Sequence, residues 1–499
     1  MRKLSPVIAC ALLATQAPAY AGPADNDLPD IGNPAGSIVT LDDEYRIGLM
    51  IMKQLRDQNA VVEDPEVQEY IQELGSKLGS QAPERQHHFQ YFVVKDSSIN
   101  AFALPGGFIG CNYGTILATT SESQLAGVLA HETAHVAQRH IARAIQAESR
   151  QSLATAAEVL AGILIGAVTG SGQVAEASVA AAQGLAAQQQ INFTRDNEYE
   201  ADRVGMGYLS HAGFDPRGMP DFFETLQRRY GYAESRVPKM LLDHPVTSDR
   251  IAEARGRAAQ LERPRKLNDS VGFALIRERL RVLTATEDTD IRGYYTRRLE
   301  MRNPPLSDQY GEALAMLARG HATDAAEILE PLISQHEGVI QLHSALGQAQ
   351  MAAGQVNDAL GTFAHAESLF PRNVPLSVHY SEALINSGHA KDAHSLLLDL
   401  FNNVEPTPAQ IRLTAQAAEA AGDHGDAYYY MGEYQIENGQ LPLAAHQYEL
   451  ALAAPGLTLI QRERFQARLD EIREFLAAER RTQRERQADN GEGGGGRHQ

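Results

Sequence analysis

The sequence contains few cysteines and is short of basic residues. Only Cys10 and Cys111 occur among 499 residues, and Cys10 lies in an N-terminal segment that we expect to be removed. Cys111 would then have no partner for an internal disulfide. Lys and Arg number 44 against 63 Asp and Glu, and the net charge is −19. This excess of acid argues against nucleic acid or an anionic lipid surface as the main partner.

Long hydrophobic runs are also missing. The most apolar internal segment, LATAAEVLAGILIGAVTG at residues 153–170, contains Glu158 and is rich in Ala and Gly. A membrane span needs about 20 consecutive apolar residues, so this segment predicts a buried or lid helix instead. The overall hydrophobic content of 43% is that of a soluble chain able to bury a sizeable core.

The N-terminus has the pattern of a secretory signal peptide. Arg2 and Lys3 precede a short apolar stretch, and Ala19-Tyr20-Ala21 fits a small-x-small cleavage site. The apolar stretch is too short to span a bilayer. We therefore predict a cleaved signal peptide at residues 1–21 and a periplasmic mature protein, with a buried N-terminal helix as the alternative.

The remaining chain divides into regions of different pattern. Residues 22–39 are rich in Pro, Gly and Asp and predict a flexible leading segment. Residues 40–262 show helical periodicity, interrupted at 87–118 by period-two, β-branched and aromatic sequence that predicts about three strands. Residues 263–305 predict a helical linker that ends at Asn303-Pro304-Pro305. The predicted fold class is α+β and mostly helical.

The C-terminal half repeats itself every 34 residues. Four glycines, each followed by Asp-Ala at a fixed offset, mark the repeat: Gly320, Gly354, Gly388 and Gly422. This period is typical of tetratricopeptide repeats, whose stacked helix pairs form an all-α solenoid that binds proteins. We predict such a domain at residues 306–478 and disorder in the charged, glycine-rich tail, residues 479–499.

Residues 131–135 read HETAH, which indicates a zinc site. On a helix, positions i and i+4 differ by about 40°, so His131 and His135 can bind one zinc ion. Glu132 lies about 100° round from His131, where it can act on a water molecule as general base. An ordinary solvated helix is the alternative. Gln138 and Ile141 break the longer HExxHxxGxxH motif, and His140 is predicted to be a plain polar helix residue.

A third ligand is expected from the segment RDNEYEAD, residues 195–202. Glu198 and Asp202 are four residues apart and share one helical face. Glu198 could bind the metal ion, while Asp202 accepts a hydrogen bond from the outer nitrogen of His131. Glu200 is expected to point elsewhere. The alternative is a solvated acidic start of a helix.

The order of these motifs carries a family resemblance. HETAH, RDNEYEAD and DHPVTSDRI (residues 243–251), followed by tetratricopeptide repeats, resemble the BepA family of periplasmic β-barrel assembly-enhancing proteases, relatives of HtpX and the CAAX prenyl proteases. The resemblance covers nearly the whole mature chain. It implies zinc ligands at His131, His135 and Glu198 and a catalytic carboxylate at Glu132. It also implies an essential acid at Asp202, described as a proton donor, although support of His131 is physically simpler.

The resemblance implies further roles around the site. His244 would occupy the fourth zinc position and hold the enzyme inactive, unless it only packs a loop. Arg250 would stabilise the oxyanion or is a surface arginine. A substrate would add as a strand along an edge formed by Asn100, Ala101, Phe102 and Ala103, unless this segment is a plain core strand.

The implied function is that of a zinc-dependent endopeptidase with one Zn²⁺ per chain and a chaperone-like role. Expected partners are outer-membrane β-barrel proteins, their assembly machinery and unfolded or misassembled substrates, with no nucleic acid and at most peripheral membrane contact. Two alternatives remain: a non-proteolytic repeat chaperone or adaptor with a structural or latent zinc site, and a pure scaffold. Prenyl-protease activity is not expected, because the sequence has no set of long membrane spans.

Overall fold

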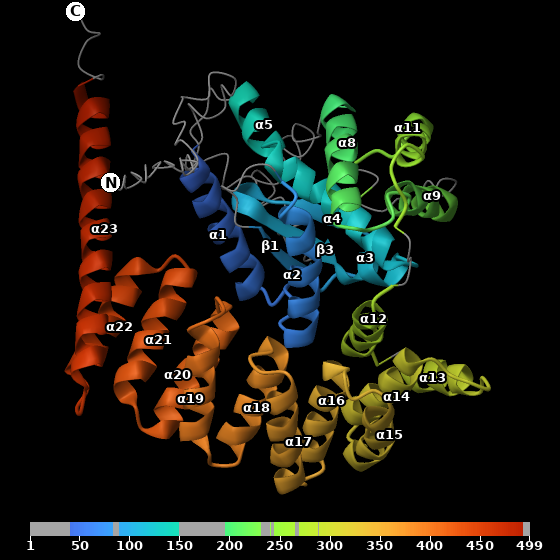
Figure 1. Ribbon diagram of the computed structural model, residues 1–499. Helices are drawn as coiled ribbons and strands as arrows, with labels where there is room; N and C mark the ends of the chain where they lie inside the picture. Colours follow the sequence, from blue (N-terminus) through green and yellow to red (C-terminus); the bar gives the residue numbers. More distant parts are fainter. Residues whose placement is uncertain are drawn as a thin grey trace, which may run out of the picture.

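The computed structural model describes residues 40–82, 89–148, 195–230, 240, 244–264, 269–287 and 289–492. The predicted signal peptide, the leading segment and the apolar segment 153–170 lie outside these residues. An N-terminal part, in which helices pack around a small sheet, is followed by an arc of paired helices (Figure 1). The predicted mostly helical α+β fold is thereby confirmed.

The sheet has the three strands that the sequence predicts. β1 (Gln90–Val94) runs parallel to β3 (Phe108–Asn112), and β2 (Ala101–Ala103) runs antiparallel to β3, so the order is β1-β3-β2. The short 3-10 turn η2 (Pro105–Gly107) joins β2 to β3. Because β3 is the central strand, β1 and β2 both form edges of the sheet.

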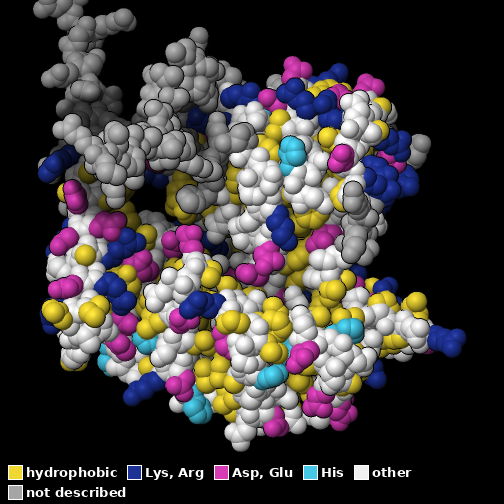
Figure 2. Space-filling model, viewed as in Figure 1, with side chains coloured by type: hydrophobic (Ala, Val, Ile, Leu, Met, Phe, Trp, Pro, Cys, Tyr) yellow, Lys and Arg dark blue, Asp and Glu magenta, His cyan; other side chains and the backbone are white. Residues whose placement is uncertain are grey.

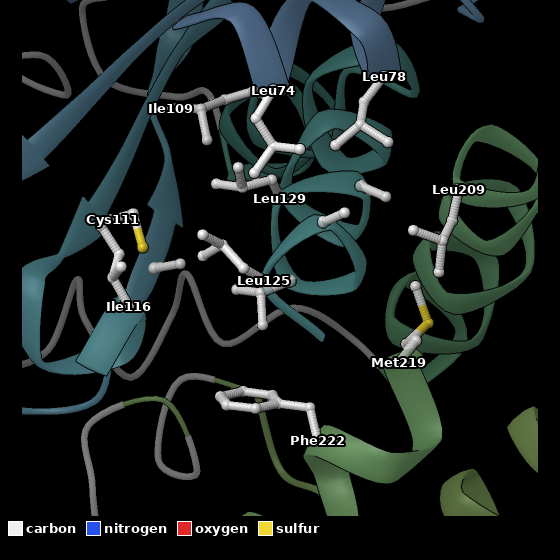
Figure 3. Close-up of a cluster of buried hydrophobic side chains, with 14 of the residues drawn as sticks. Leu74, Leu78, Ile109, Cys111, Ile116, Leu125, Leu129, Leu209, Met219 and Phe222 are labelled. Atoms are coloured by element: carbon white, nitrogen blue, oxygen red, sulfur yellow. The ribbon is translucent and has the colours of Figure 1, made fainter. Parts of the chain in front are cut away.

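Helix α4 is the centre of the N-terminal core. In Figure 3, its Leu125 and Leu129 lie between Ile109 of β3 on one side and Leu209 of α8 on the other. Tyr91 of β1 adds a buried hydrogen bond of 2.9 Å to Thr133 of α4. Each buried leucine contributes roughly 1.5–3 kcal/mol relative to exposure, so α4 is firmly held. The helices of this part are α1 (Leu41–Asp57), α2 (Pro65–Gly79), α3 (Tyr113–Ala118), α4 (Glu122–Ala137), α5 (His140–Glu148), α8 (Arg195–His211), α9 (Gly218–Tyr230) and α11 (Ser248–Ala258).

The predicted helical solenoid is also confirmed. The four repeat glycines have φ values of 83°, 77°, 84° and 83°, and each lies between the two helices of a pair. Only glycine adopts this left-handed conformation without strain, which explains its 34-residue recurrence. After the linker helices α12 (Val271–Leu283) and α13 (Ile291–Leu299), the repeat helices are α14 (Leu306–Ala318), α15 (Ala322–Gln335), α16 (Ile340–Ala352), α17 (Val356–Leu369), α18 (Val374–Asn386), α19 (Ala390–Phe401), α20 (Pro408–Ala421), α21 (His424–Glu437), α22 (Leu441–Ala453) and α23 (Leu459–Glu492).

The last helix differs from the prediction. The sequence predicts disorder from residue 479, but α23 continues to Glu492. Residues 479–490 are rich in Arg, Glu and Gln, which have high helix propensity, so their charge does not prevent a helix. In the preceding part of α23, the ring of Phe475 lies 5.5 Å from the guanidinium carbon of Arg46 in α1. The final helix therefore contacts the N-terminal part as well as α22.

The two parts of the molecule meet along only part of their facing surfaces. A cleft of about 240 Å³ lies between them, lined among others by Arg56 of α1, Tyr91 of β1 and Gln410 of α20. Figure 2 shows the molecule hollowed between the N-terminal part and the last repeats. In the described part of the chain, no helix combines the length and apolar character that crossing a membrane requires.

A buried network of charged side chains joins the two parts. Arg279 of α12 donates to both carboxylate oxygens of Asp64, at 2.7 Å each, and lies 3.0 Å from Glu66. His379 of α18 lies 3.0 Å from the same Glu66 carboxylate and 3.1 Å from Glu382. Burial lowers the pKa of His379, but Glu66 and Glu382 outweigh it and raise the pKa to about 10. His379 is therefore a cation at neutral pH and links α18 to the start of α2.

Replacing His379 by Gln should weaken this junction in a pH-dependent way. Because the folded pKa of about 10 exceeds the usual 6.5, the stabilisation is fully present below about pH 6.5 and is lost as the pH rises through 10. A hydrogen bond to a charged group contributes about 1.5–3 kcal/mol. Urea unfolding at pH 6, 8 and 10 should show the difference between wild type and His379→Gln shrinking with pH.

The matched control is His424→Gln, which removes an exposed histidine 2.8 Å from Glu419. Exposed pairs contribute little, so this variant should unfold like the wild type at every pH. A His379→Gln effect that is independent of pH would contradict the charged state assigned to this histidine.

Candidate metal centre

Helix α4 presents its motif to the protein interior. Ser121 begins the helix as N-cap, and its side chain accepts a hydrogen bond from the Gln124 N–H. His131, Glu132 and His135 are 1%, 0% and 0% exposed. The alternative of a solvated helix is therefore wrong. Buried imidazoles and carboxylates are costly without partners, so the partners of this motif decide its chemistry.

Helix α8 packs against α4 at very short range. Gly205 faces the main chain of α4, where an added Cβ would lie 2.7 Å from the carbonyl oxygen of Ala130. Glu198 and Asp202 precede Gly205 by about two turns and one turn of the helix, and they are only 2% and 6% exposed. The close contact thus brings both carboxylates onto the histidines of α4. The alternative of a solvated acidic helix start is wrong for these two residues.

The inward-facing atoms of three predicted ligands converge. His131 Nε2 lies 3.0 Å from His135 Nε2 and 3.6 Å from Glu198 Oε2, and His135 Nε2 lies 3.5 Å from Glu198 Oε1. A tetrahedral ion bound at about 2.0–2.1 Å holds its ligand atoms about 3.3–3.4 Å apart, and the observed distances bracket this value. The three side chains therefore fit one metal ion.

The electrostatics of the site favour a cation at the same point. Burial lowers the pKa of His131, but Asp202 and Glu198 outweigh it and raise the pKa to about 10. Burial raises the pKa of Glu198, but His244 and His131 outweigh it and hold the pKa well below its usual range. The carboxylates therefore require positive charge beside them, which a bound metal ion supplies.

His244 brings a fourth donor to the same point. It is 3% exposed, and its Nδ1 lies 2.8 Å from Glu198 Oε1 and 3.4 Å from His131 Nε2. Its Nε2 lies 3.7 Å from the carboxylate of Glu132. His244 thus faces the other donors instead of packing a loop. One ligand atom from each of four residues lies within 4.8 Å of the others: His131, His135, Glu198 and His244.

Asp202 lies behind His131, on the side away from the other donors. Its Oδ1 is 2.9 Å from His131 Nδ1. Arg250 of α11 donates through Nε and Nη2 to the two Asp202 oxygens, at 2.8 Å each. Burial raises the pKa of Asp202, but His131 and Arg250 outweigh it and hold the pKa below its usual range. Asp202 is therefore an ionised hydrogen-bond acceptor.

The interpretation of Arg250 as a surface arginine is wrong. The side chain is 2% exposed, and its Nη1 lies 2.7 Å from Glu198 Oε2 and 2.9 Å from the Pro245 carbonyl oxygen. Together with the contacts to Asp202, these contacts show that the guanidinium points to Glu198, Asp202 and the Pro245 carbonyl. Its geometry supports neutralisation of the two carboxylates of α8, and the oxyanion role stays a prediction.

His140 and Glu200 lie next to the site, behind His135. His140 is 0% exposed, and its Nδ1 lies 2.8 Å from Nδ1 of His135. Its Nε2 lies 3.2 Å from Glu200, which also accepts from Arg143 at 2.9 Å. Burial lowers the pKa of His140 to about 4, so this imidazole is neutral. The prediction of a plain polar His140 is wrong, whereas Glu200 points away from the metal donors, as predicted, and toward His140 and Arg143.

The predicted substrate segment lies at an edge of the sheet. The Asn112 N–H donates to the Asn100 carbonyl, and the Leu104 N–H donates to the Phe108 carbonyl. Alternate residues of an antiparallel strand direct their main-chain groups to the same neighbour, so Phe102 also faces β3.

Ala101 and Ala103 therefore direct their N–H and C=O groups away from β3, toward the edge. The same edge receives the segment that carries His244, since the Met240 N–H lies 3.5 Å from the Ile99 carbonyl oxygen. The strand side chains are largely buried, with Ala101 at 0% and Phe102 at 9% exposure. The segment is thus both part of the core and an edge.

Comparison with known proteins identifies the family. Residues 62–258 match peptidase family M48. The Beta-barrel assembly-enhancing protease of Escherichia coli K12 is 31% identical over 485 residues, which cover 94% of this chain and 96% of that protein. The Vibrio cholerae counterpart is 34% identical over 479 residues, which cover 94% of this chain and 98% of that protein. The chain belongs to the family of β-barrel assembly-enhancing proteases.

As a β-barrel assembly-enhancing protease of this family, the chain is a metalloprotease. More distant relatives are similar to only a part of it. The mitochondrial metalloendopeptidase OMA1 of Schizosaccharomyces pombe is 32% identical over 166 residues, covering 33% of this chain and 44% of that protein. The comparisons support the protease interpretation and not the alternatives of a non-proteolytic adaptor or a scaffold. They imply a metal ion, and the donors around His131 fit one.

Gly205 and Gly207 offer a test of how α8 positions the site. In Gly205→Ala the new Cβ would clash with the main chain of α4, so we expect a loss of about 1–3 kcal/mol in unfolding free energy and weaker metal binding. Gly207 lies on the same helix with no atom within 4 Å of its added Cβ. Gly207→Ala should be neutral or stabilise by up to about 1 kcal/mol.

The measurement is urea unfolding together with metal titration of both variants. Equal behaviour of the two variants would contradict the role of the close helix contact, since both substitutions have the same intrinsic helix propensity effect.

Proposed function

We propose that this protease is a periplasmic zinc-dependent endopeptidase that acts in the assembly and quality control of outer-membrane β-barrel proteins. The names of its full-length relatives support the field of action. One structural observation carries the chemistry. The donor atoms of His131, His135 and Glu198 converge on one point, with the carboxylate of Glu132 buried beside them on the same helix.

We assign the zinc ligands to His131, His135 and Glu198. Two imidazole nitrogens and a carboxylate form a donor set that zinc accepts in catalytic sites, with a fourth position left for water or substrate. A bound zinc ion supplies Lewis-acid polarisation of the scissile carbonyl and lowers the pKa of the attacking water. The distances between the three donor atoms, 3.0–3.6 Å, support this assignment, because they suit the binding of one ion.

Glu132 is assigned as the general base. Its position next to His131 on α4 directs it to the same space as the ligands, as its 3.7 Å distance from His244 supports. There the carboxylate accepts the proton of the attacking water and returns it to the nitrogen of the leaving amine. Asp202 is assigned to hold His131, because the paired Arg250 keeps it ionised and leaves it no proton to donate.

His244 is assigned as the latch of a latent resting state. Its Nδ1 takes the fourth donor position and its Nε2 lies near Glu132, so it occupies the space that the attacking water needs. The same short segment places Met240 against Ile99 at the edge of β2. Withdrawal of this segment would therefore free the fourth position and the sheet edge together.

The edge that this withdrawal would free is assigned to substrate. The outward main-chain groups of Ala101 and Ala103 can pair with an extended polypeptide, which gives affinity with little sequence preference. Such binding suits unfolded or misassembled chains, whose backbone is accessible. The repeat helices are assigned to dock these clients or the β-barrel assembly machinery, with a chaperone-like effect. The signal-like residues 1–21 support a periplasmic location with at most peripheral membrane contact.

The assignments of the zinc ligands, the general base and the latch are tested together by measuring zinc content and proteolysis of an unfolded test protein. We expect near-stoichiometric zinc in wild type, Glu132→Gln and His244→Ala. Glu132→Gln should lose at least about 100-fold in activity, as expected for a general base, and His244→Ala should gain activity.

The control is His211→Ala, which alters an exposed histidine at the end of α8 and should leave both readouts unchanged. Zinc without proteolysis in every variant, including trials with an outer-membrane β-barrel precursor, would contradict the proposed endopeptidase mechanism. Absence of zinc from the wild type would refute the ligand assignment.

The edge assignment predicts an effect of proline at Ala103. Proline lacks the N–H that would pair with substrate, while the ladder to β3 uses the groups of the neighbouring residues. We expect Ala103→Pro to lower kcat/KM for an unfolded protein about 10-fold or more at unchanged zinc content. Ala103→Ser retains the N–H and should cleave like the wild type. Equal rates for the two variants would exclude pairing at this residue.

A further inference from the structure

The two histidines of α4 are supported by α8 in two different ways. His131 Nδ1 lies 2.9 Å from a carboxylate oxygen of Asp202. His135 Nδ1 lies 2.8 Å from Nδ1 of His140, and His140 Nε2 lies 3.2 Å from Glu200. A carboxylate of α8 thus stands behind each histidine, directly for His131 and through an inserted imidazole for His135.

We propose that His140 and Glu200 form a positioning relay that orients His135 for metal binding. This proposal rests on the metal-ligand role assigned to His135 above. A neutral imidazole that binds metal through Nε2 carries its proton on Nδ1. His135 Nδ1–H therefore donates to His140 Nδ1, and His140 holds its own proton on Nε2 and donates it to Glu200. Each nitrogen of the relay then has a defined role.

The chain turn between α4 and α5 places His140 for this contact. Arg139 has a φ of 52°, a conformation that a non-glycine residue keeps only where its surroundings hold it. Its buried guanidinium provides such a hold, since Nε donates to Glu44 of α1 at 2.9 Å. If α4 continued unbroken, His140 would lie about 140° round the helix from His135. The break at Arg139 returns it to the face of His135.

The far end of the relay is held as well. Arg143 of α5 donates through Nη2 to the same Glu200 oxygen that faces His140, at 2.9 Å. This arrangement repeats the one on the other side of the site, where Arg250 holds Asp202 behind His131. Each metal-facing histidine thus has a carboxylate behind it, and each carboxylate has an arginine. The relay supports His135 with a neutral imidazole, whereas His131 has an anion behind it.

The test compares His140→Phe, which fills the space without an acceptor, with His140→Asn, which retains an acceptor for the His135 proton. Zinc dissociation constants are measured by competition with a chelator, and urea unfolding is measured without metal. Loss of a hydrogen-bond partner behind a metal ligand typically costs about 10–100-fold in affinity. We expect this loss in His140→Phe and recovery of most of it in His140→Asn. His211→Gln, an exposed histidine on α8, should bind zinc like the wild type.

A double-mutant cycle with Glu200→Gln tests whether the two residues act as one relay. We expect the loss of zinc affinity in His140→Phe/Glu200→Gln to be smaller than the sum of the two single losses, because either change interrupts the same chain of hydrogen bonds. Additive losses would overturn the relay. Zinc binding of wild-type strength in His140→Phe would also overturn it. So would equal losses of zinc affinity in His140→Phe and His140→Asn that are proportional to their losses of unfolding free energy. Absence of zinc from the wild type would refute the proposed function and the relay together.

Discussion

The close contact of α4 with α8 brings two imidazoles and two carboxylates into one space that water does not reach. Gly205 makes this approach possible because a larger residue would clash with Ala130. An ionised carboxylate buried without compensation is very costly. The positive charge of Arg250, which contacts both Glu198 and Asp202, offsets this cost in part. A cation bound by the converging donors would offset it further. Metal binding is thereby built into the electrostatics of the helix pair.

The same contact places three of the four converging donors on two helices that pack against each other. α4 is buried along its length and packs against the sheet and α8. His244 comes from a different part of the chain, whose described residues also contact the core: Met240 is buried in the same cluster, Val246 packs against it, and the Pro245 carbonyl accepts from Arg250. The fourth donor is thus supplied separately from the helix pair that carries the other three.

Much of this architecture could be predicted from the sequence, and the failures have a common cause. The shared face of His131 and His135 and the recurrence of glycine every 34 residues both follow from helix geometry alone. The place of His140 could not be predicted, because the sequence does not reveal the left-handed conformation of Arg139 between α4 and α5. The helical end of α23 could not be predicted, because a charged composition is compatible with both disorder and a long helix.

The sequence by itself determined which segments are helices, which faces carry histidines or carboxylates, and where the helix pairs repeat. These properties depend on neighbours within a few residues along the chain, so a local pattern specifies them. Only the tertiary structure decided which buried polar group meets which partner: Arg250 with Asp202, His140 with His135, and His379 with Glu66. These pairs are separated by up to 313 residues. They form because a buried polar group has no water to bind and needs a protein partner, and tertiary packing supplies that partner from a distant part of the chain.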